Sequence, residues 1–320
     1  MLGPTFSVAR GRDAGLSVKQ LRRADLAAPF RGVRAAASAP TDPRGIRTGR
    51  VPTPLELEAL ALAAAYAERM APHEFFTGRT AGLILGAPVP GLRDSRPHVG
   101  VLAPARLKRV RGVHGHELQP VSTRVIRNTK TGWRITSPAT TWASLGASIA
   151  DPYDLIAVAD YFVRVPQMPG GFDGDLGDPI ADLAQLRAAV FAGRRVGGPA
   201  LRAALPRVRT GSSSRPETWM RLVLVDHGLP EPALDHDVFA DDGDFIAALD
   251  QAYPALRVGI EYEGEHHLTD PRQWARDIAR YERLAAAGRI IIRVTKEMLS
   301  RHPERFVARV RAALARAARL

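Results

Sequence analysis

The most constraining feature of this chain is a cluster of titratable side chains at residues 261–267, where three glutamates and two histidines follow a mostly apolar run. That run, residues 256–260, predicts a buried strand that continues into Glu261. Two carboxylates about 4 Å apart repel by roughly 4 kcal/mol at an effective dielectric constant near 20. A fold can therefore keep these acids together only if a cation shares the site or if their side chains alternate away from one another.

Length and composition bound the fold class. With 320 residues, the chain can form two or three domains, each with its own core. It has no cysteine, which excludes disulfides and thiolate metal sites and fits a reducing cytoplasm. No apolar run approaches the roughly 18 residues of a membrane helix, and the start lacks the apolar stretch of a signal peptide. We therefore expect a cytoplasmic α/β multidomain protein with no membrane partner.

The charge is distributed unevenly along the chain. The net charge is +12, and the surplus of arginine and lysine lies in the first 150 residues. A basic front half favours nucleic acid over a small acidic substrate as the partner. Further on, residues 211–270 are strongly acidic and residues 271–320 are strongly basic. This contrast suits a metal site next to a polyanion, or two stretches that neutralise each other; charge alone does not decide between them.

Residues 1–50 have the pattern of a winged helix-turn-helix. A first helix is followed by a tight turn, and Ser17 with Gln20 forms a capping box that predicts a second helix. Residues 30–34 then fit the wing, and the second helix would enter a major groove. The alternative is a small helical cap with a solvated basic face. On the first interpretation, the residues that contact nucleic acid are Lys19, Arg22, Arg23 and Arg34.

Residues 51–165 alternate helical and strand patterns and predict a middle α/β domain. His114 and His116 stand in one predicted strand, and we interpret them as surface histidines of a hairpin rather than as metal ligands. Residues 166–210 begin with a stretch rich in proline, glycine and aspartate, which predicts a linker followed by a helix.

Residues 211–320 predict the element order α-β-β-β-α-β-α, in which two neighbouring strands carry acids. Asp250 and Glu261 on adjacent strands can converge on one divalent cation, Mg²⁺ (or Mn²⁺), because hard cations prefer carboxylate oxygens. Glu263 points to the same face of its strand as Glu261, and Glu217 on the opening helix could supply a third carboxylate. The alternative is that only Glu261 is buried and the acids after it are solvated.

The same segment resembles the PD-(D/E)XK nuclease superfamily and, within it, Vsr-like endonuclease domains. The matching pieces are SRPETWMRLVLVDHGLPEP, ALDQAYP, GIEYEGEHH and RDIARYERLAAAGRIIIRVT, in family order. The resemblance implies a restriction-endonuclease-like α/β core in which Asp250 is the invariant acid, Glu261 is the acid of the ExK-like pair and Glu217 is the helix acid. Further characteristic positions are matched by His267, Arg276, Asp277 and Arg280.

Two positions depart from that family pattern. Glu263 stands where the superfamily has its lysine, and Gly288-Arg289 stands where these relatives have Gly-Trp. Without the lysine, His267 or an arginine has to activate water or face the phosphate. Arg276 and Arg280 are one helical turn apart and could clamp a phosphate together.

The front half resembles the AbiEi-type antitoxins of type IV toxin–antitoxin systems. The matching pieces are VARGRDAGLSVKQLRRADLAAPFRGVRAAA, FFTGRTAGLILGAPVP and WRITSPATTWASL. The resemblance implies a winged helix-turn-helix joined to a second α/β domain, and it implies a partner toxin.

The sequence thus predicts a DNA-binding protein with a metal-dependent endonuclease-like domain that hydrolyses phosphodiester bonds. The alternative is a non-catalytic, antitoxin-type transcriptional regulator whose nuclease domain is degenerate. On the first interpretation the catalytic residues are Glu217, Asp250, Glu261, Glu263 and His267, the metal ligands are Asp250 and Glu261, and Arg276 and Arg280 join the nucleic-acid contacts.

Overall fold

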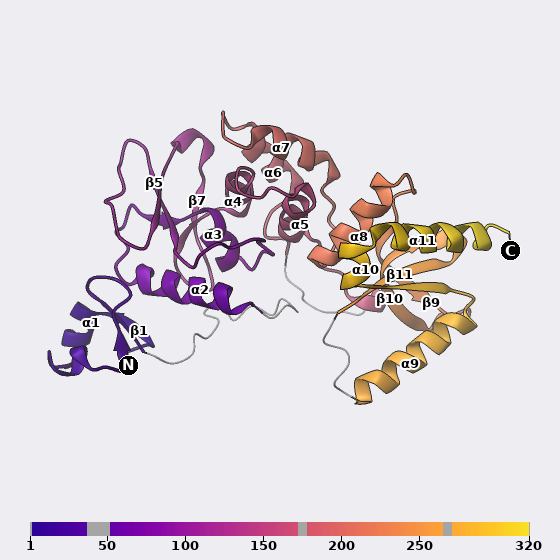
Figure 1. The fold of residues 1–320 in the computed structure, drawn as a ribbon, viewed down its shortest axis with the longest axis horizontal. Helices are drawn as coiled ribbons and strands as arrows, with labels where there is room; N and C mark the ends of the chain where they lie inside the picture. The colour runs from indigo at the N-terminus through magenta and orange to yellow at the C-terminus, as the bar shows by residue number, and fades with distance from the viewer. Residues whose placement is uncertain (1, 37–51, 172–177, 265–270, 320) are drawn as a thin grey trace. The chain divides into compact units, whose positions relative to one another are not determined.

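The protein is a mixed α/β chain of two compact units (Figure 1). Its structure, a computed structural model, describes residues 2–36, 52–171, 178–264 and 271–319. The N-terminal unit comprises Met1–Ala150 and Leu183–Pro206, and the C-terminal unit comprises Asp151–Asp182 and Arg207–Leu320. The α/β multidomain class is therefore confirmed. The segment 166–210, expected from the sequence as one linker and helix, is divided between the units: its part up to residue 182 belongs to the C-terminal unit, and residues 183–206 belong to the N-terminal unit.

The chain begins with a small three-stranded sheet in the order β1-β3-β2. Ser17 and Gln20 form the expected reciprocal capping contacts, at 2.8 and 3.2 Å. The helix that they were expected to begin is only a 3₁₀ turn, because Arg23 already has an extended backbone and the chain turns into the next strand. Buried Phe6, Leu21 and Val33 form the core of this part. Its elements are β1 (Thr5–Ser7), α1 (Val8–Asp13), η1 (Gln20–Arg22), β2 (Leu26–Ala27) and β3 (Val33–Ala36).

The rest of the N-terminal unit is built on a five-stranded sheet in the order β6-β5-β4-β8-β7. The pairs β5–β6 and β4–β8 are parallel, and the others are antiparallel. The strands are β4 (Phe75–Phe76), β5 (His98–Leu102), β6 (His114–Leu118), β7 (Val125–Arg127) and β8 (Arg134–Thr136). The helices of the unit are α2 (Pro54–Ala67), α3 (Gly78–Ile84), α4 (Pro138–Leu145), α6 (Leu183–Phe191) and α7 (Gly198–Ala204), with 3₁₀ turn η2 (Pro120–Ser122).

The C-terminal unit is built on a four-stranded sheet in the order β12-β11-β10-β9, with only β11–β12 parallel. Its strands are β9 (Ala233–Phe239), β10 (Phe245–Tyr253), β11 (Val258–Glu263) and β12 (Ile290–Thr295). Its helices are α5 (Pro152–Val163), α8 (Arg215–Asp226), α9 (Pro271–Ala286), α10 (Lys296–Arg301) and α11 (Pro303–Ala317), with 3₁₀ turns η3 (Pro169–Gly171) and η5 (Pro254–Leu256). From α8 onward the order of helices and strands is the expected one, with α10 as an addition.

Helices cover both faces of this second sheet (Figure 1). Helices α8, α10 and α11 share one apolar cluster with Ile260 and Ile292 of the sheet. Leu284 of α9 packs in a second cluster with Val238 and Leu249. Because Ile260 belongs to the first cluster, its neighbour Glu261 points to the opposite face, toward α9.

A buried ionic network holds α8 against α5. Asp160 is fully buried on α5 and lies 3.0 Å from a guanidinium nitrogen of Arg221 on α8. Its carboxylate also accepts hydrogen bonds from the Thr218 hydroxyl, at 2.8 Å, and from the backbone N–H of Arg209, at 2.8 Å. The network fixes the position of α8, whose first turn carries Glu217.

We expect Asp160→Ala to lower the free energy of unfolding of the C-terminal unit by about 3–5 kcal/mol, because it leaves the Arg221 guanidinium buried without its main counter-ion. Glu297→Ala is the control, since the Glu297–Arg301 pair of the same unit is 3.9 Å long and exposed at both ends. The control is expected to cost at most about 0.5 kcal/mol. Denaturant titration measures both, and equal losses in the two variants would contradict the assignment.

Candidate functional site

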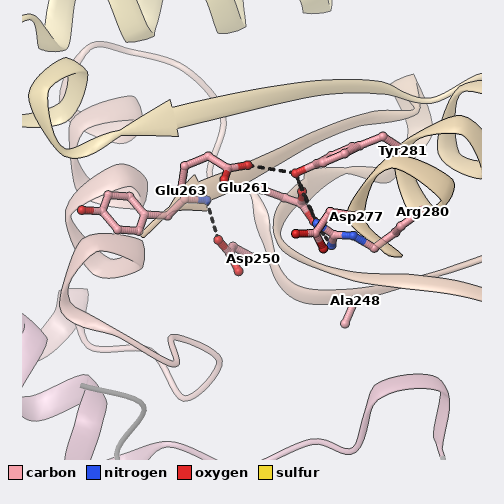
Figure 2. A pocket seen from close by; sticks show the side chains of 8 residues that line it. Ala248, Asp250, Glu261, Glu263, Asp277, Arg280 and Tyr281 are labelled. Atoms are coloured by element: carbon pink, nitrogen blue, oxygen red, sulfur yellow. Dashed lines mark hydrogen bonds and ion pairs between the residues drawn. The ribbon is translucent and has the colours of Figure 1, made fainter. Parts of the chain in front are cut away.

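An open cleft of about 330 Å³ lies between β10, β11 and α9 in the C-terminal unit (Figure 2). Four residues expected from the sequence to act together line it: Asp250, Glu261, Glu263 and Arg280. The rest of the lining is made by Ala248, Tyr262, Asp277 and Tyr281.

Asp250 and Glu261 face each other across two paired strands. In the antiparallel register of β10 and β11, Gln251 is opposite Ile260, so the next pair along is Asp250 and Glu261. One oxygen of Asp250 accepts the backbone N–H of Tyr262 at 2.7 Å. Burial raises the pKa of Asp250 to about 6, since the Tyr262 N–H and nearby Arg280 only partly offset burial and the charge of Glu261. The pair of acids predicted from the sequence is thus brought together.

Glu261 is buried and paired with a cation. Arg280 donates to both of its carboxylate oxygens, at 2.7 and 3.2 Å, which makes a bidentate ion pair. The hydroxyl of Tyr281 lies 2.7 Å from Oε2 of the same carboxylate. The cation that the crowded acids require is therefore, in part, a guanidinium from α9.

Glu263 shares the same hydroxyl and has a guanidinium of its own. The Tyr281 Oη lies 2.9 Å from Oε1 of Glu263 (Figure 2). The same oxygen of Glu263 also accepts from Nε of Arg293. Burial and the two carboxylates raise the pKa of Tyr281, so its hydroxyl stays protonated. Tyr281 and Arg293 were not singled out from the sequence, and Arg293 is an exposed residue of the otherwise mostly apolar strand β12.

Glu217 lies outside the lining of the cleft. Its side chain is buried and accepts the backbone N–H of Ser213 at 2.6 Å, while its backbone carbonyl accepts from the side chain of Gln251 at 2.7 Å. Burial and the nearby charge of Asp250 raise the pKa of Glu217 to about 8. Glu217 is therefore within electrostatic range of Asp250, but it carries a proton at pH 7.

The remaining predicted residues of this domain are placed as follows. Arg276 is exposed on α9 and does not line the cleft, whereas Asp277 lines it. His267 lies outside the described residues. Within the described ranges, no group of three or more histidine, cysteine, aspartate or glutamate side chains is arranged to hold a metal ion.

The four basic residues predicted to contact nucleic acid in the N-terminal unit fall into two groups. Lys19, Arg22 and Arg23 are exposed, although Arg23 pairs with Asp25 at 2.8 Å. Arg34 is partly buried and donates to the backbone carbonyls of Leu21, at 2.6 Å, and Val33. Its guanidinium therefore ties the 3₁₀ turn η1 to strand β3.

From the sequence, the two histidines of β6, His114 and His116, were expected to be surface residues of a hairpin. The structure contradicts this expectation. Strands β5 and β6 are parallel, which places His98 opposite His114 and stacks its ring on that of His116. Nδ1 of His98 lies 2.9 Å from Nε2 of His116, and His114 contacts Asp94 at 3.1 Å. Burial lowers the pKa of His98 to about 3, and burial also lowers the pKa of His116.

In the part of the chain that the structure describes, we find no helix with the length and apolar character needed to cross a membrane.

We expect the free energy of unfolding to fall as pH rises from 6.5 to 7.5, by up to about 1.4 kcal/mol through Glu217. An ordinary glutamate releases its proton near pH 4.5, whereas folded Glu217 keeps it up to about pH 8, so the folded state binds more protons in this window. Denaturation of Glu217→Gln should show a flatter dependence and greater stability at pH 7.5, and exposed Glu304→Gln serves as the control. Equal slopes for wild type and Glu217→Gln would mean that Glu217 is charged.

Comparison with known proteins identifies two relatives but no family. No family model and no solved structure matches the chain. Two uncharacterized proteins of Mycobacterium tuberculosis, one from strain CDC 1551 / Oshkosh and one from strain ATCC 25618 / H37Rv, are each 29% identical to it over 229 residues. The aligned region covers 71% of this chain and 73% of each relative. The chain is thus similar to mycobacterial proteins over most of its length, and their names state no activity.

Proposed function

We propose that this protein is a cytoplasmic DNA-binding protein that hydrolyses phosphodiester bonds with Mg²⁺ or Mn²⁺ in the cleft of its C-terminal unit. The observation that carries the proposal is the position of Asp250 and Glu261, opposite each other on neighbouring strands, with Arg280 of α9 at the same cleft. Two carboxylates and a guanidinium suit a substrate that carries a phosphate and a divalent cation.

The donor set fits a hard cation with few protein ligands. Arg280 and Tyr281 occupy up to three of the about four acceptor positions of the Glu261 carboxylate, so at least one remains. Asp250 accepts a hydrogen bond from the backbone N–H of Tyr262. Mg²⁺ is commonly held by one or two carboxylates together with water and substrate phosphate, which matches this pair. When bound, such an ion lowers the pKa of a water and stabilises charge on the phosphoryl oxygens.

The protein's own residues supply orientation and charge balance. Arg280 holds the Glu261 carboxylate in place and puts positive charge at the cleft, where an attacked phosphate would sit. Glu263 forms an ion pair with Arg293, which makes its carboxylate a weaker candidate for the general base. His267 keeps that role as a proposal because an imidazole titrates near neutrality.

The order of elements supports a nuclease-like core. Helix α8 precedes three antiparallel strands, α9 follows, and β12 returns parallel to β11. This is the order predicted from the sequence pattern, and it is compatible with the restriction-endonuclease-like core that the resemblance to PD-(D/E)XK and Vsr-like domains implies. The acids Asp250 and Glu261 fall on the two central strands of the sheet.

The small N-terminal sheet supports a DNA-binding module of winged helix-turn-helix type. Strands β2 and β3 pair antiparallel, as the hairpin of a wing would, and the exposed residues Lys19 and Arg22 shortly precede them in the sequence. The second helix is short, so phosphate contacts suit this module better than a long recognition helix in a groove. A partner toxin follows only from the resemblance to AbiEi-type antitoxins.

The second candidate is a non-catalytic, antitoxin-type transcriptional regulator with a degenerate nuclease domain. Glu263 replaces the superfamily's lysine, and both oxygens of Glu261 already have donors in Arg280 and Tyr281. Among the described residues, no group of three or more histidine, aspartate or glutamate side chains is arranged to hold the metal. These features favour a site that binds DNA or a partner without cutting.

We expect the full chain to nick plasmid DNA with Mg²⁺ or Mn²⁺, and Asp250→Asn to lower the rate by about a hundredfold or more, because the substitution removes a charged ligand and keeps the shape. Calorimetry should show Mn²⁺ binding to wild type that is lost in Asp250→Asn. Asp244→Asn is the control, since Asp244 is exposed just before β10 in the same unit. A wild-type protein that binds DNA but cuts no substrate with either metal favours the regulator.

We expect binding of the full chain to duplex DNA to weaken steeply with salt, because phosphate contacts release counter-ions. The double variant Lys19→Ala/Arg22→Ala should lower the slope of log K against log salt by about 2, close to one for each lost phosphate contact. Lys130→Ala is the control, since Lys130 is an exposed cation in the turn between β7 and β8. If the double variant keeps the wild-type slope, the N-terminal module does not contact DNA.

A further inference from the structure

The hydroxyl of Tyr281 sits at the centre of the cleft's hydrogen-bond network. Its oxygen lies 2.7 Å from Glu261, 2.9 Å from Glu263 and 3.2 Å from a donating nitrogen of Arg280. Its ring is flanked by two guanidinium groups, with Arg280 at 4.8 Å and Arg293 at 5.0 Å from the ring centre. The same two arginines are the ion-pair partners of the two carboxylates.

The Tyr281 hydroxyl has fewer protons to donate than it has carboxylate acceptors within reach. A phenol has one proton to donate, and here two carboxylate oxygens lie within hydrogen-bond distance of it. One of its lone pairs accepts from Arg280, so the donated proton passes to Glu261 or Glu263 but not fully to both. The two acids, two residues apart on β11, are thus tied to one shared donor.

The ring cannot move freely to relieve this arrangement. Cation–π contacts with Arg280 and Arg293 hold it in place. A fixed ring fixes the position of its hydroxyl, and the hydroxyl in turn fixes Oε2 of Glu261. The acceptor position of Glu261 that remains for a cation is oriented as a consequence.

We propose that Tyr281 is a positioning residue that orients the Glu261 carboxylate through its hydroxyl and thereby sets the affinity of the Asp250–Glu261 pair for a divalent cation. The inference rests on the proposed metal-dependent function. The proposed effect on metal affinity comes from one atom of α9, the hydroxyl oxygen of Tyr281, which acts through Glu261 and not directly on the substrate. Hydrogen-bond donors behind metal-binding carboxylates typically account for 10–100-fold in metal affinity.

The substitution Tyr281→Phe isolates that atom, because phenylalanine keeps the ring on which both guanidinium groups stack. Calorimetric titration of the full chain with Mn²⁺ at constant pH is expected to give a dissociation constant about tenfold or more above that of wild type. Thermal unfolding of the same sample shows whether the variant remains folded, which separates positioning from a general loss of structure.

Tyr253→Phe is the matched control. Tyr253 is a buried tyrosine of the same sheet, and its hydroxyl donates to the backbone carbonyl of Pro230 at 2.8 Å, away from the lining of the cleft. The control is expected to lower the unfolding midpoint and to leave the Mn²⁺ affinity within twofold of wild type. Tyr281→Phe with an affinity within twofold of wild type, or tighter, would overturn the proposal. A wild type that binds no Mn²⁺ would overturn the proposed metal function and this inference with it.

Discussion

The bidentate ion pair between Glu261 and Arg280 is the contact on which the candidate site depends. It joins β11 to α9 and so fixes the two elements that enclose the cleft. Glu261 is nearly buried, and a buried carboxylate without a cation would take up a proton or destabilise the fold. The guanidinium of Arg280 balances the negative charge of Glu261. This lowers the repulsion between the two carboxylates and allows Asp250 of β10 to lie opposite Glu261 of β11.

Three carboxyl groups in or near this cleft have different surroundings. Glu217 is buried beside another acid and keeps its proton at pH 7, with a pKa of about 8. Asp250 has one backbone donor, and its pKa is raised to about 6, just below neutrality. Glu261 lies 2.7 Å from a guanidinium nitrogen of Arg280 and 2.7 Å from the Tyr281 hydroxyl. The site can therefore hold its acids together without a bound ion, and an arriving cation would compete with a proton at Asp250.

The sequence predicted most of the C-terminal unit, because local apolar patterns determine its helices and strands and neighbouring strands bring Asp250 to Glu261. It did not predict contacts between distant segments. The parallel pairing that places His98 beside His114, and the buried pair that holds α5 to α8, join residues with no local signal for each other. Tyr281 was missed for a similar reason, since its role depends on how α9 packs against β11.

Anomalous X-ray scattering from crystals of the full chain soaked in Mn²⁺ tests the central claim most directly. The account predicts one strong peak in the C-terminal unit, about 2.0–2.6 Å from a carboxylate oxygen of Asp250 and from one of Glu261. It also predicts that Glu217 makes no contact with the ion, since its side chain does not line the cleft. A cleft without a peak at saturating Mn²⁺, or a peak bound by other residues, would contradict the account.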